Sequence, residues 1–93
     1  MRPGEIRDRL DTSHTKTVVV LSSETFNVMT GHAIVAPFQM TDKVYPGIQA
    51  EGGFIAFMIL YSVPVSALSD SRGHVGTDAI EEAQALIAGA MTR

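Results

Sequence analysis

The chain has 93 residues, of which 45% are apolar and 18% charged, and this balance favours one compact domain spanning residues 1–93. It contains no cysteine, which excludes a disulfide framework, a thiolate metal site and a cysteine nucleophile. Residues 44–93 hold two arginines and five acidic residues, which account for the whole formal net charge of −3. Net acidity argues against sequence-independent binding to long duplex DNA, but a basic groove built from residues 1–43 could hold a short RNA.

No targeting or membrane segment is expected. Met1–Leu10 carries three arginines and two acidic residues without an apolar run, unlike a signal peptide. The longest apolar stretch, Phe54–Tyr61, has eight residues and is far too short to span a bilayer. We therefore expect a cytoplasmic protein with no membrane partner.

The first half of the chain predicts strands separated by polar turns. Lys16–Ser22 is the clearest strand, because it contains three consecutive valines and its apolar residues of both parities indicate that both faces are covered. Gly4–Arg9 and His32–Phe38 are expected to be further strands. A single helical turn is expected at Ser23–Phe26, capped by one of the serines at positions 22 and 23.

The second half begins with a predicted hairpin. Ile48–Glu51 is a short strand, and Gly52-Gly53 signals a two-residue turn because glycine takes positive φ at low cost. Phe54–Tyr61 is expected to follow as one buried strand, whose surplus of apolar surface also suits a dimer interface. Alternating apolar residues then predict a half-buried strand over Val63–Ala67, with Pro64 at an edge or a bulge.

The last segment predicts an amphipathic helix that follows a loop at Ser69–Gly76. Asp78 precedes a helix of about 13 residues, and Asp78 with Glu81 forms a capping-box pattern. The apolar stripe expected to cover the sheet consists of Ile80, Ala83, Ile87 and Met91. Five or six strands followed by one helix define the fold class as α+β, with a small, strongly twisted antiparallel sheet or an open barrel.

Motifs for common cofactor and metal chemistries are absent. The sequence has no Walker-type phosphate loop, dinucleotide fingerprint, nucleophile elbow or metal-ligand spacing, so neither a metal nor a cofactor is expected. His32 and His74 are expected at the surface. His14 lies two residues before Lys16, so the two side chains would share one face of an extended strand. The alternative interpretation of this pair is a solvated strand end.

A polar loop directly follows the predicted strand His32–Phe38. It begins with Gln39, Met40, Thr41, Asp42 and Lys43. Loops of this kind often carry function because the scaffold fixes them while leaving them accessible, although a plain connection is the alternative.

The order of three motifs resembles the MazF/PemK family of mRNA endoribonuclease toxins. The motifs are Gly4-Glu5-Ile6, then Lys16–Ser22 with Asn27 after it, and then Val35-Ala36-Pro37-Phe38. The resemblance covers residues 4 to 38, with further support from Tyr45-Pro46 and the terminal helix. It implies an SH3-like barrel with a C-terminal helix, a homodimer, and a cognate antitoxin whose extended acidic tail blocks the site. It also implies metal-independent cleavage of single-stranded RNA by attack of a 2′-hydroxyl on its own phosphate.

The sequence departs from the family pattern at the catalytic positions. The family's catalytic arginine aligns with Lys16, and its catalytic threonine aligns with Gln39, with Thr41 two residues further on. The aromatic residue after the first motif is Arg7 here, and the Asp-Gln segment of a later strand is replaced by Leu60-Tyr61.

The implied reaction needs charge stabilisation on the phosphate, removal of the 2′-proton and protonation of the leaving 5′-oxygen. We expect Lys16 to bind and stabilise the phosphate and Gln39 or Thr41 to orient it. His14 has an unperturbed pKa suited to shuttling the proton. Five further residues are expected to contact RNA: Met40 and Tyr45 at the bases, and Arg7, Arg9 and Lys43 at the phosphates.

Two other functions stay open. CcdB toxins, which poison gyrase, are similar in fold and bind their protein target through C-terminal aromatic and apolar residues, whereas this chain ends in Ala90-Met91-Thr92-Arg93. An inactive relative that only titrates an antitoxin is the second alternative, because of the replacements at Lys16 and Gln39. The class of RNA, whether mRNA, tRNA or rRNA, is also left open.

Overall fold

A computed structural model describes residues 1–12, 16–41 and 45–92, which form one antiparallel sheet and two α-helices. The strands are β1 (Glu5–Asp8), β2 (Thr17–Val20), β3 (His32–Gln39), β4 (Ile48–Ala50), β5 (Gly53–Ile55), β6 (Tyr61–Pro64) and β7 (Gly73–His74). The helices are α1 (Glu24–Thr30) and α2 (Thr77–Met91), and a 3₁₀ turn, η1, spans Val65–Ala67. The predicted α+β class, with its twisted antiparallel sheet and C-terminal helix, is confirmed.

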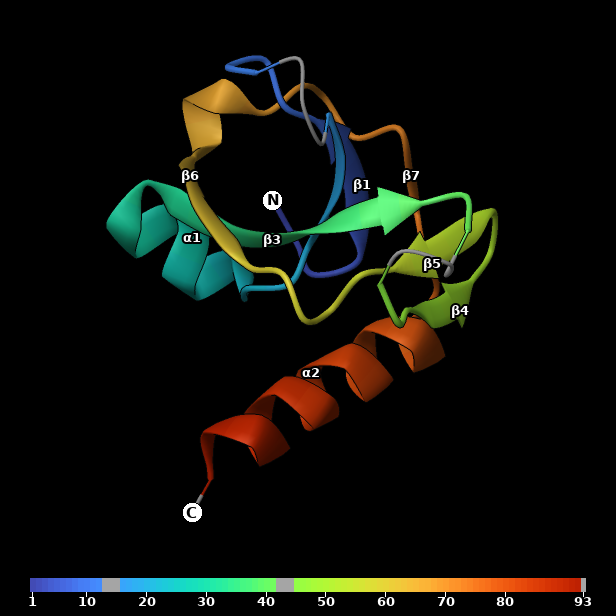
Figure 1. The fold of residues 1–93 in the computed structure, drawn as a ribbon. Coiled ribbons are helices and arrows are strands. Elements are labelled where there is room, and N and C mark those ends of the chain that lie inside the picture. The colour runs from blue at the N-terminus through green and yellow to red at the C-terminus, as the bar shows by residue number, and fades with distance from the viewer. Residues whose placement is uncertain (13–15, 42–44, 93) are drawn as a thin grey trace.

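The sheet curls around β3 and closes into a small barrel (Figure 1). β2 lies along one edge of β3, while β6 and then β5 pair with the other edge. β1 pairs with β2, and β7 pairs with β1. A bridge between Arg9 and Leu68 joins the end of β1 to the segment after η1. The N–H of Leu10 donates to the carbonyl of Ala67 at 2.7 Å, which completes the closure.

Pro37 lies where β3 changes its partner. The carbonyl of Ile34 accepts from the N–H of Leu21 on the β2 side, so by alternation the backbone groups of Pro37 face the other edge. There β6 pairs with residues 32–35 and β5 with residues 38–39. Pro37 therefore sits between two partners, where no ladder N–H is needed, and its carbonyl accepts from the N–H of Ala56 at 2.9 Å.

β2 separates two apolar layers, as its valine run predicts. Inside the barrel lie Val18, Val20, Ala33, Val35, Val63 and Leu68. The outer layer lies between the sheet, the β4–β5 hairpin and α2, and consists of Val19, Leu21, Ala36, Ile48, Ile55, Val75, Ala79, Ile80 and Ala83. Alternate side chains of β2 thus enter opposite layers, and both faces of the strand are buried.

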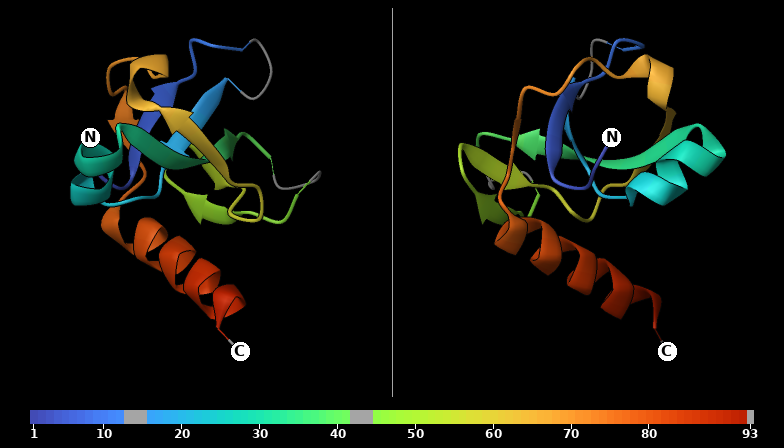
Figure 2. Two further views of the ribbon diagram at one scale, coloured as in Figure 1. Left: turned by 90° about the vertical axis from the view of Figure 1, so that its left-hand side faces the viewer. Right: turned by 180° about the vertical axis from the view of Figure 1, so that it is seen from behind.

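α2 packs on the sheet through its first half. Its buried residues are Ala79, Ile80 and Ala83, whereas Ile87 is half-buried and Met91 is 75% exposed. The two views of Figure 2 show the C-terminal half of α2 projecting away from the barrel. The predicted stripe therefore covers the sheet over two turns only.

Several boundaries differ from those predicted. The predicted capping box was wrong, because the N-cap of α2 is Gly76. Asp78 lies in the first turn instead, where its negative charge interacts favourably with the helix dipole. Phe54–Tyr61 is not one strand, because local turns follow β5, with the N–H of Phe57 donating to the carbonyl of Ile55. η1 replaces the last residues of the strand predicted over Val63–Ala67, and β7 lies in the predicted loop before α2.

α1 is longer than the predicted single turn, and Asn27 anchors it. Ser23 Oγ accepts from the N–H of Phe26 as the N-cap, and Gly31 ends the helix with a φ of 68°. The buried Asn27 Nδ2 donates to the carbonyls of Met1, at 3.1 Å, and Ser22, at 3.3 Å. This amide ties the start of the chain to the helix and keeps a buried polar group satisfied.

We predict that Gly4→Ala destabilises the fold. Gly4 has a φ of 93° and lies under the His74 ring, which an added methyl group would contact. That ring is fixed, because its Nε2–H donates to the carbonyl of Pro3 and its Nδ1 accepts from the N–H of Gly76. The expected loss is about 1–3 kcal/mol in the free energy of unfolding, measured by urea denaturation.

The matched control is Gly89→Ala in α2, where an added methyl group meets no atom within 4 Å. This variant should gain up to about 1 kcal/mol from the higher helix propensity of alanine. Equal urea midpoints for Gly4→Ala and the parent would contradict the prediction.

Candidate functional site

Three residues proposed from the sequence form a row at one end of the sheet. The N–H of Arg9 donates to the carbonyl of Lys16 at 2.6 Å, which continues the pairing of β1 with β2. β2 pairs Val18 with Pro37, and this register carried two residues further sets Lys16 opposite Gln39. The row Arg9, Lys16, Gln39 therefore crosses three neighbouring strands.

The side chains of this row share the inner face of the barrel, at its rim. Alternation places Lys16 on the same face as Val18, which lies inside the barrel. The guanidinium of Arg9 lies over the ring of Tyr61, with Cζ 5.0 Å from the ring centroid. The stacked Arg9 thus covers the rim beside Tyr61. The rim beside Lys16 is open to solvent, because Lys16 is exposed.

An open pocket of about 540 Å³ lies beside this row. It is lined by Arg9, Leu10, Asp11, Thr12 and Lys16. A cation and an ion pair thus face one cavity, which is a suitable arrangement for an anionic ligand.

Lys16 is the one cationic side chain without a carboxylate partner in the described ranges 1–12, 16–41 and 45–92. The four arginines there are all paired: Arg2 with Glu24, Arg7 with Glu5, Arg9 with Asp11, and Arg72 with Asp8. Lys16 is exposed, so its ammonium is available to a ligand.

Gln39 carries an unsatisfied acceptor. Its Oε1 is buried and has no hydrogen-bond partner in the part of the chain that the structure describes. A buried acceptor without a donor is unfavourable, so this amide oxygen is a weak point of the fold at the rim. Met40 and Thr41 follow directly and are exposed, with Met40 at 82%.

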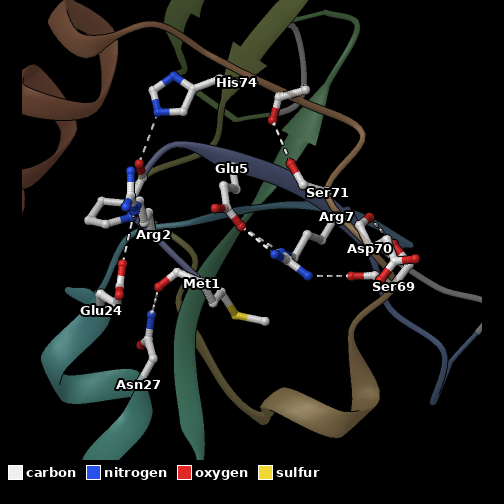
Figure 3. Close-up of polar contacts among 12 residues, drawn as sticks. Met1, Arg2, Glu5, Arg7, Glu24, Asn27, Ser69, Asp70, Ser71 and His74 are labelled. Atoms are coloured by element: carbon white, nitrogen blue, oxygen red, sulfur yellow. Dashed lines mark hydrogen bonds and ion pairs between the residues drawn. The ribbon is translucent and has the colours of Figure 1, made fainter.

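Arg7 holds the barrel together instead of facing solvent (Figure 3). It forms an ion pair with Glu5, and its Nη1 donates to the carbonyl of Ser69 at 2.7 Å. Both charged side chains are less than 20% exposed. Burial alone raises the pKa of Glu5, but the hydrogen bond and charge of Arg7 outweigh it and hold this pKa below its ordinary value.

The structure brings together only part of the proposed site. Lys16, Gln39 and Arg9 lie in one row, while Arg7 is engaged in the ion pair with Glu5. Tyr45 is 42% exposed, and His14 and Lys43 lie outside the described residues.

Sequence reasoning missed two members of the site, Asp11 and Tyr61. Asp11 lies two residues after Arg9, and this spacing in a β-rich segment was a usable signal for an ion pair. No comparable signal links Tyr61 to Arg9, because only closure of the barrel brings them together.

No group of three or more potential metal ligands of the His, Cys, Asp or Glu type lies together in the described residues. Within the same residues, no helix is long and apolar enough to cross a membrane.

No family model matches the sequence, and no curated protein matches it. The structure is similar to MazF from Deinococcus radiodurans, with 18% identity, a TM-score of 0.75, and coverage of 98% of this chain and 96% of that one. The MazE–MazF complex from the same organism gives 16% identity and a TM-score of 0.78, over 98% and 95% of the two chains. A mycobacterial endoribonuclease in complex with its cognate antitoxin gives 16% identity and a TM-score of 0.73, with coverage of 96% of this chain and 95% of that one. The chain therefore has the MazF fold, as the resemblance in its sequence implies.

We predict that the Glu5–Arg7 pair makes stability depend on pH. Because the folded-state pKa of Glu5 is lowered, its stabilising contribution is present above the ordinary value of 4.5 and is lost as the pH falls below it. Glu5→Gln should destabilise the fold at pH 7 by about 1–2 kcal/mol. The difference between variant and parent should shrink between about pH 5 and pH 3, measured by urea denaturation at each pH.

Glu51→Gln is the matched control, because Glu51 is an exposed acid in the β4–β5 turn. It should follow the parent at every pH. A Glu5→Gln penalty that stays constant down to pH 3 would contradict the prediction.

Proposed function

We propose that the chain is the toxin of a type II toxin–antitoxin system and cuts single-stranded RNA without a metal. In this proposal it acts in the cytoplasm as one domain spanning residues 1–93. The observation that carries the proposal is the exposed Lys16, which has no carboxylate partner among the described residues and lies opposite Gln39 at the rim of a MazF-like barrel. The likeness to a mycobacterial endoribonuclease in complex with its antitoxin supports both the activity and the partner.

The chemistry follows from the two side chains. The ammonium of Lys16 stabilises the charge that develops on the phosphoryl oxygens. Gln39 Nε2 or Thr41 donates a hydrogen bond to a phosphoryl oxygen and so orients the phosphate. The 2′-oxygen bonds to phosphorus as the bond to the 5′-oxygen breaks, which yields a 2′,3′-cyclic phosphate and a 5′-hydroxyl. The proton leaves the 2′-oxygen and one is delivered to the 5′-oxygen, the role proposed for His14.

RNA specificity would come from the residues around this centre. Met40 and Tyr45 are exposed and suited to contacts with splayed bases. Arg9 and Lys43 are proposed at the phosphates, whereas Arg7 is part of the scaffold through its ion pair with Glu5. An acidic antitoxin tail would compete for the same cation, because Lys16 attracts a carboxylate as it does a phosphate.

We predict that Lys16→Ala lowers the rate of RNA cleavage by at least about 10²-fold, the usual scale for a lost electrostatic contact to the transition state. The assay incubates purified protein with a mixed-sequence single-stranded RNA in EDTA and maps the fragment ends. Arg2→Ala is the matched control, because it removes one exposed positive charge elsewhere. It should change the rate by less than about twofold.

Each result of this assay discriminates between functions. Cleavage at a short recurrent sequence by the parent, but not by Lys16→Ala, supports the ribonuclease. Full cleavage activity of Lys16→Ala would contradict the assignment of Lys16 to the catalytic site. Growth arrest by both proteins without RNA cleavage would favour a toxin that binds a protein target. A folded parent that neither cleaves RNA nor arrests growth would be an inactive relative that titrates the antitoxin.

The proposal includes a homodimer. Exposed apolar side chains lie in the segment between β5 and β6, where Met58 is 63% exposed, and on α1, where Met29 is 81% exposed. Such surface suits a protein interface. Light scattering should give about twice the chain mass of 10.0 kDa, and a mass near 10.0 kDa throughout a dilution series would exclude the dimer.

A further inference from the structure

Arg9 has an arrangement that the other described arginines lack. Its guanidinium is held from below by the ring of Tyr61 and from the side by Asp11. Arg9 Nε donates to Asp11 Oδ1 at 3.0 Å, and Arg9 Nη2 donates to Asp11 Oδ2 at 3.2 Å. Two parallel N–H donors thus meet two oxygens of one carboxylate.

A phosphate can accept the same two hydrogen bonds. The planar fork of arginine binds carboxylates and phosphates in one bidentate geometry. Asp11 therefore occupies the donors of Arg9 that a phosphate would take. Lys16 directly precedes the neighbouring strand β2 and lines the same pocket as Arg9 and Asp11, so RNA bound at Lys16 would pass this fork.

The pair of Arg9 and Asp11 can open at little cost to the fold. Arg7 also contacts a backbone carbonyl across the barrel, and Asp8 accepts from both Arg72 and Thr17. The Asp11 carboxylate, by contrast, accepts from one other side chain in the described residues, that of Arg9, and is 38% exposed. The hydrogen bond from Arg9 lowers the pKa of the Asp11 carboxyl group, because it favours the charged form.

We propose that Arg9 is a second phosphate-binding residue of the RNA groove and that Asp11 is an internal competitor that holds its guanidinium closed until RNA displaces it. The proposal rests on the proposed function, because it assigns the adjoining phosphate of the same single-stranded RNA to Arg9. Tyr61 keeps the guanidinium plane in place during the exchange, so Arg9 loses little freedom when a phosphate replaces Asp11.

The test measures binding of a fluorescent, uniformly 2′-O-methylated RNA of mixed sequence, which cannot be cleaved by 2′-hydroxyl attack. Asp11→Asn should bind about three- to fivefold more tightly than the parent, because one exposed ion pair no longer has to be displaced. Glu82→Gln makes the same change of charge on the exposed face of α2, and its RNA affinity should stay within about twofold of that of the parent. Arg9→Gln should weaken binding, and the gain from Asp11→Asn should vanish in the Arg9→Gln background.

The outcomes separate this proposal from the proposed function. If Lys16→Ala weakens binding while Asp11→Asn and Glu82→Gln bind alike, the competitor role of Asp11 is overturned and the RNA site stands. A gain from Asp11→Asn that persists in the Arg9→Gln background also overturns that role. If neither the parent nor Asp11→Asn binds the RNA, both proposals are overturned. Far-UV circular dichroism and a thermal melt show that each variant is folded.

Discussion

The eight residues of β3 form hydrogen bonds with three partner strands, β2, β5 and β6. The shape of the rest of the molecule depends on how β3 divides its two edges among them. Along one edge β2 pairs continuously, while along the other β6 gives way to β5 at Pro37. This change of partner accompanies the curl of the sheet, which brings Leu68 back to Arg9. Gln39 ends β3, opposite Lys16, which directly precedes β2.

Hydrophobic patterns in the sequence predict those strands and helices whose pairing partners are near in sequence or whose side chains are buried in a regular way. The valine run at β2 and the spacing in α2 are of this kind, and both elements lie where the sequence places them. Phe54–Tyr61 misleads because hydrophobicity does not reveal where β3 changes partner. The end of β5, the turns after it and the first residue of β6 therefore look like one strand. Lys16 and Gln39 could be proposed from aligned motifs, whereas the stack of Arg9 on Tyr61 follows only from closure of the barrel.

The charges are arranged so that the protein offers little positive surface in total. Every arginine in the described ranges meets a carboxylate, and exposed α2 adds the acids Asp78, Glu81 and Glu82. Attraction at long range is therefore weak, and in the proposed function an anionic ligand is recognised at short range by Lys16 and the groups beside it. This pattern suits a short single-stranded site better than a long polyanion, whose affinity depends on many neutralised phosphates.

The bridge between Arg9 and Leu68 has a consequence for the order of events during synthesis. It joins the first strand to a segment that leaves the ribosome much later, and contacts so distant in sequence form late because the intervening chain must first be ordered. Lys16 and Gln39 can be aligned by β2 and β3 alone, but the stack of Arg9 on Tyr61 has to wait for the second half of the chain. A nascent chain therefore carries an incomplete rim until translation has passed β6 and η1, which delays the complete site until the protein is almost finished.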